Sequence, residues 1–359
     1  MAGPFDLLDG HEQVVFGQDR EVGLRCIIAI HSTALGPALG GTRFYPYTEE
    51  RDALVDVLRL SRAMAYKAAC AGLDLGGGKA VIIGDPGVDK TEALLRAYGR
   101  VVQSLGGRYV TACDVGTAPA DMSLVRRETR WATGMEEAQG GSGDSGVLTA
   151  YGTFVGIRAC VERVYGSASL GGRHVAIQGV GKVGRRLAAL LAEAGATLTV
   201  ADVDTAAAEA CAERVGAAVV PAEAIHAVPA DVFSPNALGG VIDDETLPDL
   251  ACAIVAGAAN NQLADERHGD ALADAGILYA PDYVINAGGL IQVADELHPG
   301  GYRVERARRH VEDIAGRLHD VFAVAAQEGC STAAAAEHYA ERRMAAVGRL
   351  RGFWLPDGT

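Results

Sequence analysis

The feature that most constrains the fold is a glycine-rich turn between two patterned runs in the second half of the chain. Residues 174–202 contain an apolar run "HVAIQ", the turn "GVGKVG", the amphipathic run "RRLAALLAEAG" and a further apolar run "TLTVAD". This order predicts a strand, a helix and a second, parallel strand. The apolar runs "AAVV", "DVFSP", "AIVAGAA" and "ILYAPD" follow, so we expect an α/β fold with a doubly wound sheet of parallel strands.

The glycines of this turn form the pattern G-x-G-x-x-G, which indicates dinucleotide binding when a strand precedes it and a helix follows. Glycines permit a tight turn and close backbone approach to a pyrophosphate, and the helix N-terminus offers N–H groups to the phosphates. The expected contacts with the cofactor are Gly179, Val180, Gly181, Lys182, Val183 and Gly184. The alternative is that these residues only form a turn of an α/β sheet.

The choice of dinucleotide depends on Asp202, which ends the strand after the turn. A carboxylate at this position accepts hydrogen bonds from the ribose hydroxyls of NAD and repels the 2′-phosphate of NADP. The next two residues, Val203 and Asp204, include no arginine that would bind such a phosphate. The sequence therefore predicts NAD as the cofactor.

Polar residues end three later apolar runs, and ligands of doubly wound sheets bind beyond the carboxyl ends of the strands. They are Asn236, the pair Asn260 and Asn261, and Asp282 with Asn286. Asparagine is also a common turn residue, so each could have only that role. Asn260 and Asn261 are the best candidates, because their amides could pair with the carboxamide of nicotinamide.

A second glycine-rich stretch, "AGLDLGGGKAVIIGDP", precedes and includes Lys79 but does not form a P-loop. Leu73 and Ala80 replace the glycine and the hydroxyl residue that a P-loop needs, and "AVIIG" indicates a strand. Lys79 and Lys67 are candidates for holding a carboxylate or moving protons. Two lysines in a partly buried site lower each other's proton affinity, and Asp114 in "TACDVGT" could accept a proton. Solvated surface lysines are the alternative.

Composition and charge exclude several classes of protein. A chain of 359 residues is long enough for two domains, and 49% hydrophobic residues exclude disorder. A net charge of −14 argues against a nucleic-acid surface. The seven cysteines include no C-x-x-C pair, no apolar run is long enough to span a membrane, and the first residues do not resemble a signal peptide. We expect a cytoplasmic protein with reduced thiols and no metal.

Several motifs together resemble one known family. "LGPALGGTRFYPY", "AYKAACAGLDLGGGKAVIIGDP", "GRYVTACDVGT", "GAANNQLADERHGD" and "ILYAPDYVINAGGLIQVADEL" occur in order from about His11 to the end. They resemble the leucine/valine branch of the glutamate, leucine, phenylalanine and valine dehydrogenases. The resemblance implies a homo-oligomer that carries out reversible, NAD-dependent oxidative deamination of leucine, valine and isoleucine to 2-oxo acids and ammonia. Residues 1–144 would form a substrate domain, completed by a C-terminal helix at about 330–359, and residues 145–329 a Rossmann-type NAD domain.

The same resemblance implies roles for individual residues. Lys67 would bind the substrate α-carboxylate, and Lys79 would polarise the attacking water and stabilise the carbinolamine. Asp114 would carry protons to and from the amino group. The resemblance places Asn261 and Asn286 beside the nicotinamide and the substrate. It also implies that the glycines before Lys79, with Gly40 and Gly41, let the backbone approach the bound amino acid.

Specificity for the substrate side chain also follows from the resemblance. Leu39 stands where glutamate-specific relatives carry a lysine, so the pocket should reject glutamate. With Ala112, Leu290 and Val293 it would form an apolar lining suited to branched aliphatic chains, among which discrimination is weak. Two residues depart from the family pattern. They are Asn236, near the adenosine in place of cysteine, and Leu290, in place of a valine.

Two other functions remain open from the sequence. One is a catalytically silent NAD-binding sensor, which would have no need of Lys67, Lys79 and Asp114 together. The other is a related oxidoreductase that acts on aromatic amino acids, against which Leu39 is the main argument.

Overall fold

The computed structural model describes residues 7–8 and 10–351, which divide into two compact units. Unit 1 contains the described residues up to Gly143, the segment Gln292–Val304, and the chain from Ala340 on. Unit 2 contains Asp144–Ile291 and Glu305–Tyr339. The sequence analysis expected divisions at residues 144/145 and about 330, and it gave no sign of the segment Gln292–Val304. The expected C-terminal helix beyond residue 351, and residues 1–6, lie outside the described residues.

Unit 1 is built on a mixed sheet with the strand order β1-β2-β4-β3-β5. Its strands are β1 (Gln13–Asp19), β2 (Leu24–Ser32), β3 (Ala38–Tyr45), β4 (Gly76–Ile83) and β5 (Tyr109–Cys113). Strand β2 pairs antiparallel with β1 and β4, whereas β3 pairs parallel with β4 and β5. The strand that "AVIIG" indicated is confirmed as the second half of β4.

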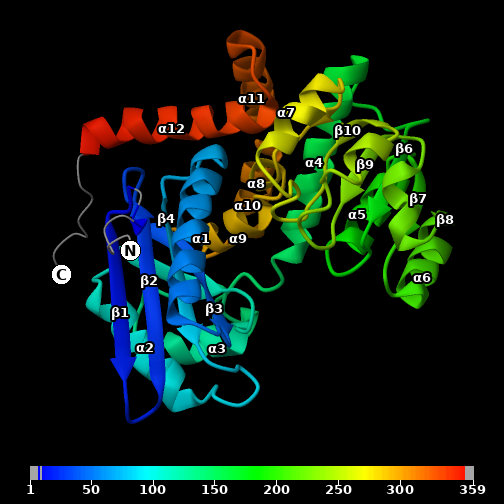
Figure 1. Cartoon of the computed structure of the whole chain (residues 1–359). Helices are drawn as coiled ribbons and strands as arrows, with labels where there is room; N and C mark the ends of the chain where they lie inside the picture. Colours follow the sequence, from blue (N-terminus) through cyan, green and yellow to red (C-terminus); the bar gives the residue numbers. More distant parts are fainter. Residues whose placement is uncertain (1–6, 9, 352–359) are drawn as a thin grey trace. The chain divides into compact units, whose positions relative to one another are not determined.

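Helices cover both faces of this sheet (Figure 1). They are α1 (Glu50–Cys70), α2 (Glu92–Ser104) and α3 (Pro119–Val125). Helix α2, capped by the side chain of Thr91, buries Leu95 and Tyr98 against Ile82 on one face. Helix α1 packs on the other face, where Val57 meets Val81. Since side chains alternate along a strand, β4 directs Lys79 to the same face as Val81.

The glycines before Lys79 belong to β4 itself, where they let other elements pack closely. A Cβ on Gly77 would lie 2.1 Å from the backbone nitrogen of Ala65, so α1 approaches the sheet more closely than a side chain would permit. Every residue of β4 is buried. The glycines therefore have a packing role within the protein, in addition to whatever role they have toward a substrate.

Unit 2 contains a parallel sheet with the strand order β11-β10-β9-β6-β7-β8. Its strands are β6 (His174–Gln178), β7 (Thr197–Ala201), β8 (Ala218–Val219), β9 (Ala230–Pro235), β10 (Cys252–Val255) and β11 (Leu278–Tyr279). Numbered within the sheet this order is 3-2-1-4-5-6 from β8 to β11, the order of dinucleotide-binding folds, with the switch point between β6 and β9. The expected doubly wound sheet is confirmed.

The remaining helices alternate with these strands or follow them (Figure 1). They are α4 (Gly146–Tyr165), α5 (Gly184–Glu193), α6 (Thr205–Val215), α7 (Arg267–Asp274), α8 (Asp282–Ile285), α9 (Gly288–Asp295), α10 (Val304–Glu312), α11 (Ile314–Glu328) and α12 (Thr332–Arg351). Short 3-10 turns occupy Glu137–Gln139, Ala222–Ala227 and Leu247–Asp249.

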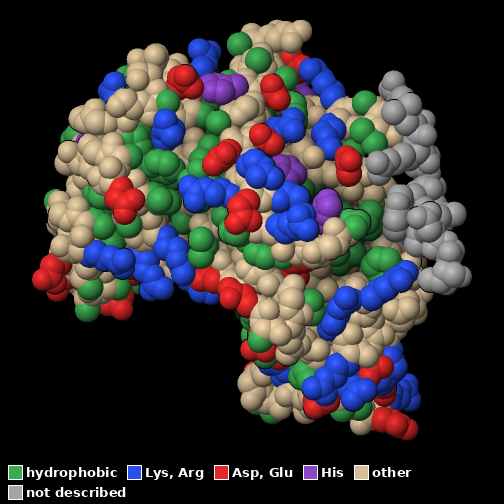
Figure 2. Space-filling view, turned by 180° about the vertical axis from the view of Figure 1, so that it is seen from behind, with side chains coloured by type: hydrophobic (Ala, Val, Ile, Leu, Met, Phe, Trp, Pro, Cys, Tyr) green, Lys and Arg blue, Asp and Glu red, His purple; other side chains and the backbone are tan. Residues whose placement is uncertain are grey.

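The surface carries charged side chains of both signs, as the sequence contains both. Figure 2 shows basic and acidic side chains interspersed over the face that it draws. All seven cysteines are free thiols. In the described part of the chain, helices fall short of the length and apolar character that crossing a bilayer requires.

Candidate functional site

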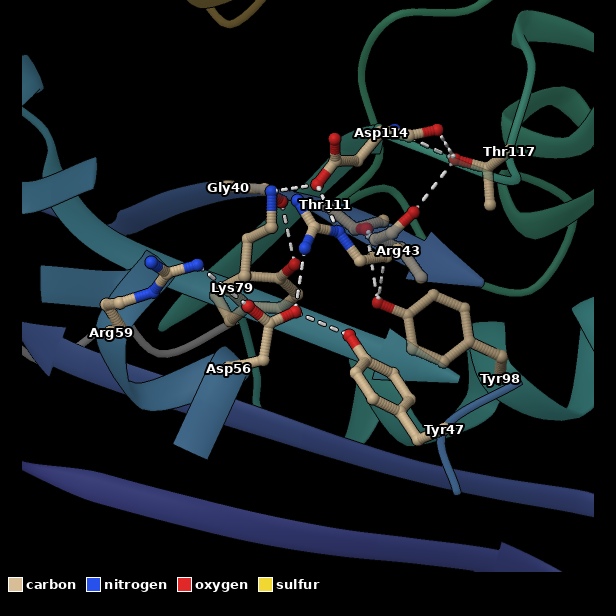
Figure 3. Close-up of polar contacts among 12 residues, drawn as sticks. Gly40, Arg43, Tyr47, Asp56, Arg59, Lys79, Tyr98, Thr111, Asp114 and Thr117 are labelled. Atoms are coloured by element: carbon tan, nitrogen blue, oxygen red, sulfur yellow. Dashed lines mark hydrogen bonds and ion pairs between the residues drawn. The ribbon is translucent and has the colours of Figure 1, made fainter. Parts of the chain in front are cut away.

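The centre of the candidate site in unit 1 is an ion pair between Lys79 and Asp114 (Figure 3). Lys79 lies on β4, and Asp114 directly follows β5. Its Nζ contacts Oδ2 of Asp114 although β3 runs between the two strands. Lys79 is 6% exposed, so its charge is balanced inside the protein and not by solvent.

Gly41 in β3 allows this pair to form. It pairs with Ala112 of β5, and its neighbour Thr42 pairs with Ala80 of β4. A Cβ on Gly41 would lie 2.4 Å from the carbonyl oxygen of Cys113 and 2.9 Å from Cβ of Asp114. Because the strand carries no side chain at this point, the lysine reaches the carboxylate across it.

Arg43 is a second cation beside Asp114, and the sequence gave no indication of it. Its Nε lies 3.7 Å from Oδ2 of Asp114, and its other end is 2.7 Å from Oδ2 of Asp56 on α1. Asp56 also accepts a hydrogen bond from the hydroxyl of Tyr47 at 2.6 Å and pairs with Arg59 at 3.4 Å. Figure 3 shows this chain of contacts leading from α1 to Asp114.

The surroundings of Asp114 determine its charge. Burial is the largest single influence and raises its pKa, but it is outweighed by the charge and hydrogen bond of Lys79 and the charge of Arg43. The net result is a pKa below the ordinary value, so the group is a carboxylate at neutral pH. Asp114 can therefore accept a proton.

Thr117 holds the backbone around Asp114. The N–H of Asp114 donates to Oγ1 of Thr117 at 2.8 Å, and that hydroxyl is 2.8 Å from the carbonyl oxygen of Thr42 on β3. The loop after β5 is thus tied to the strand that separates Lys79 from Asp114. The sequence analysis missed Thr117, because its role depends on this pairing between distant segments.

Five other residues expected to bind the substrate lie on β3, β5, α1 and α9. Leu39 is 1% exposed and shares one face of β3 with Gly41, while Ala112 is 8% exposed on β5. Lys67 lies in the last turn of α1 and is partly exposed. Leu290 and Val293 are partly exposed and lie three residues apart on α9, Leu290 in unit 2 and Val293 in unit 1.

The glycine turn of unit 2 has the geometry that its sequence pattern predicts. A Cβ on Gly184 would lie 1.9 Å from the carbonyl oxygen of Gly179, so the third glycine is needed for α5 to pack against β6. The N–H of Val180 donates to Oδ2 of Asp202 at 2.8 Å. Lys182 is exposed and lies 3.3 Å from Asp144. Asp202 thus connects the turn to the end of β7.

This turn fits a bound dinucleotide. Around a Cβ built on Gly181 there is no described atom within 4 Å, so the turn is open at its second glycine. In the described structure no side chain caps the start of α5 after Val183, which leaves its N-terminus available to an anion. Open space, a helix N-terminus and the carboxylate of Asp202 are the three elements that such a cofactor needs.

The asparagines at the strand ends differ in their contacts. Asn236 connects β9 to the segment after β10, since its Oδ1 accepts from the N–H of Ala258 at 2.9 Å and its Nδ2 donates to the carbonyl of Ser234 at 2.8 Å. Asn286 is 4% exposed and donates to Oδ1 of Asn260 at 2.9 Å. The Oδ1 of Asn286 has no hydrogen-bond partner among the described residues.

Asn261 and Gln262 directly follow Asn260 in the same loop. Asn261 is exposed and has a φ of +51°, an unusual backbone conformation for a residue with a side chain. Gln262 donates through Nε2 to the carbonyl of Gly257 at 2.8 Å, and its N–H donates to Asp282 at 3.0 Å. Gln262 and Asp282 therefore position the loop that carries the asparagines, a role the sequence did not indicate for Gln262.

A dinucleotide-binding fold in one unit and a buried lysine paired with a partly buried aspartate in the other are features of a two-domain dehydrogenase. Two family models match the chain. The model described as "Glu/Leu/Phe/Val dehydrogenase, dimerisation domain" covers residues 11–131, and "Glutamate/Leucine/Phenylalanine/Valine dehydrogenase" covers residues 200–352. The chain belongs to this family of amino-acid dehydrogenases, as its motifs predicted.

Similar proteins cover nearly the whole chain. A leucine dehydrogenase of Geobacillus stearothermophilus is 50% identical over 97% of this chain and 94% of its own length. A valine dehydrogenase of Streptomyces virginiae is 55% identical over 93% of this chain and 94% of its own. The crystal structure of L-tryptophan dehydrogenase from Nostoc punctiforme is 46% identical with a TM-score of 0.85, over 95% of this chain and 97% of that one.

Proposed function

We propose that this protein catalyses the reversible, NAD-dependent oxidative deamination of branched-chain L-amino acids to 2-oxo acids, with release of ammonia. The observation that carries the proposal is the contact between the buried Lys79 and the partly buried carboxylate of Asp114. Relatives at 50% and 55% identity that are named leucine and valine dehydrogenases support the substrate class.

The proposed reaction uses three residues of unit 1. Lys67 holds the substrate α-carboxylate, and Asp114 accepts a proton from the substrate amino group. The chemistry that NAD would supply when bound is acceptance of a hydride from the substrate α-carbon, and the oxidised substrate would then be an imine. Lys79 then polarises the water that adds to the imine and stabilises the carbinolamine. Asp114 returns a proton to the nitrogen, the added oxygen gives up its two protons to Asp114 and to solvent, and ammonia leaves as the 2-oxo acid forms.

In this scheme Arg43 is a positioning residue. Its charge keeps Asp114 ionised, and its contact with Asp56 anchors the guanidinium to α1. A second cation also allows Asp114 to keep a charged partner while Lys79 interacts with water and substrate. The chain of contacts through Asp56 and Tyr47 thus supports the catalytic pair.

The residues proposed to hold the cofactor belong to unit 2. The six residues of the glycine turn, from Gly179 to Gly184, would bind the pyrophosphate, and Asp202 would bind the adenosine ribose. The carboxylate of Asp202 would disfavour a 2′-phosphate, which supports NAD over NADP. Asn236 would lie near the adenosine. Asn260, Asn261 and the buried Asn286 would contact the nicotinamide, and Asn261 and Asn286 also the substrate.

The apolar residues Leu39, Ala112, Leu290 and Val293 would line the substrate side-chain pocket. Buried Leu39 offers no charge to a glutamate side chain, which supports rejection of glutamate. The L-tryptophan dehydrogenase at 46% identity favours a second candidate substrate class, the aromatic amino acids. We further propose a cytoplasmic homo-oligomer. The free thiols support the location, and the matched dimerisation domain supports the oligomer.

The proposal is tested by following NADH formation with L-valine, L-leucine, L-phenylalanine, L-tryptophan and L-glutamate at alkaline pH. We expect turnover of valine and leucine, with glutamate silent. Faster turnover of phenylalanine or tryptophan would keep the mechanism and overturn the assignment of the pocket. If no amino acid is turned over while NADH still binds, the result would favour the catalytically silent NAD-binding sensor.

A further inference from the structure

A hollow of about 630 Å³ lies in unit 2, away from the groups considered so far. Its walls come from helices α4, α5, α6 and α10. Four arginines line it: Arg185, Arg214 and Arg308, which are exposed, and Arg186, which is partly exposed. The volume falls in the range of pockets that bind small molecules, about 300–1,000 Å³.

Two of these four arginines are neutralised by neighbours and two are not. Arg186 lies 2.8 Å from Asp144. Arg308 lies 3.7 Å from Glu312, and its guanidinium sits over the ring of Tyr151 at 4.3 Å.

Arg185 and Arg214, by contrast, have no ion pair or hydrogen bond from their side chains among the described residues. In a chain with a net charge of −14, two unneutralised cations in one hollow are a marked local excess of positive charge.

The rest of the lining is apolar. Leu148 is buried, Leu190 is partly buried, and Tyr151 contributes its ring. Guanidinium groups match the geometry of phosphate and carboxylate oxygens, which they bind through paired hydrogen bonds. Cations beside an apolar wall therefore suit a molecule with several anionic groups attached to an apolar or aromatic body.

The hollow is separate from the dinucleotide-binding turn. Helix α5 buries Leu187 and Leu191 on one side, while Arg185 and Leu190 belong to the stripe that lines the hollow. The lining includes none of the turn from Gly179 to Gly184. A dinucleotide on that turn would thus leave the hollow open.

We propose that this hollow binds a small organic anion with two or more phosphate or carboxylate groups, held by Arg185 and Arg214 with Arg186 and Arg308 beside them. The helix that contributes Arg185 is also the helix that begins at the glycine turn. Neither the binding nor its test depends on which amino acid the protein oxidises.

The test is calorimetric titration of the full chain with ATP, inorganic tripolyphosphate and citrate, each in the presence of saturating NADH to fill the dinucleotide site. The variant is Arg185→Gln/Arg214→Gln, and the control is Arg309→Gln, an exposed arginine on α10 outside the lining. We expect one anion per chain and at least about tenfold weaker binding in the double variant, with the control unchanged.

The three probes identify the ligand chemistry. If the double variant loses the binding of ATP and tripolyphosphate, the ligand of the hollow is a phosphorylated molecule. If it loses the binding of citrate, the ligand is a polycarboxylate. Tighter binding of ATP than of tripolyphosphate would support the role of the apolar wall, and equal binding would contradict that role. Equal binding of the probes by the double variant, or no binding of any probe to the natural protein, would overturn the proposal.

Discussion

Lys79 and Asp114 form an ion pair across a strand that places no side chain between them. Gly41 occupies the crossing point, with Asp114 and the backbone of Cys113 too close to admit a Cβ. The pair therefore depends on one missing methyl group in β3. This arrangement connects the packing of the sheet directly to the proposed chemistry.

Gly41→Ala should disrupt the pair. The new methyl would press on backbone and on Asp114, so we expect a loss of about 1–3 kcal/mol in the free energy of unfolding and a large fall in kcat. Urea unfolding and NADH formation measure the two effects. Gly316→Ala is the matched control, because nothing lies within 4 Å of a Cβ on that helical glycine in the described structure. Turnover of Gly41→Ala at the natural rate would contradict the role given to the crossing.

Asp114→Asn should lower kcat by about 10²–10⁴-fold, as expected for removal of a proton acceptor. The charge also affects stability, because the pKa of Asp114 is lower in the folded protein than its ordinary value. Such a carboxyl stabilises the fold above its unfolded pKa, and this contribution is lost as the pH falls through the folded pKa.

The stability difference between the natural protein and Asp114→Asn should therefore be constant from pH 7 to 5 and shrink only below about pH 4. Urea unfolding at each pH measures this difference. A difference that disappears between pH 7 and 5 would show that the pKa of Asp114 is raised in the folded protein.

Arg43→Gln should raise the pKa of Asp114, because it removes a positive charge that favours the carboxylate. We expect the acid limb of the kcat/KM profile to move to higher pH, with partial recovery in Arg43→Lys. Arg25→Gln removes an exposed arginine paired with Glu50 and serves as the control. A pH profile that keeps its position in Arg43→Gln, with only its height reduced, would assign Arg43 a purely structural role.

Asp202→Ala should weaken the binding of NADH more than that of NADPH, since the lost carboxylate favours the ribose hydroxyls and repels a 2′-phosphate. Fluorescence titration with both nucleotides measures the change. Asp204→Asn is the control, because it removes a nearby charge and keeps a side chain able to cap α6. An equal loss for the two nucleotides would refute the ribose assignment.

The parallel sheet could be predicted from the sequence because β6 and β7 are apolar runs, α5 is amphipathic, and the glycine turn specifies the connection between β6 and α5. Strand β3 could not be predicted in the same way. Its sequence "ALGGTRFY" has two glycines and no apolar alternation, and it becomes a strand through pairing with β4 and β5. Arg43 was missed for this reason, since its place beside Asp114 follows from the register of β3.

The asparagines illustrate the same limit in unit 2. Their positions after apolar runs placed them at strand ends, where ligands of such sheets bind, and in the structure the side chains of Asn260 and Asn286 are hydrogen-bonded to each other. The sequence does not show which asparagine has a side-chain oxygen without a hydrogen-bond partner and which one connects two strands, because this depends on how the strand ends pack. Asn236 has its amide engaged by Ser234 and Ala258, whereas Asn286 keeps Oδ1 without a partner in the described structure.

The most direct test of the account is the turnover of Lys79→Ala with L-leucine and L-valine, measured with NADH binding in the same preparation. The account predicts that NADH formation falls by at least about 10²-fold. It also predicts that NADH binds as in the natural protein, because Lys79 belongs to unit 1 and the glycine turn to unit 2. Turnover close to that of the natural protein would contradict the central claim that the Lys79–Asp114 pair carries the chemistry.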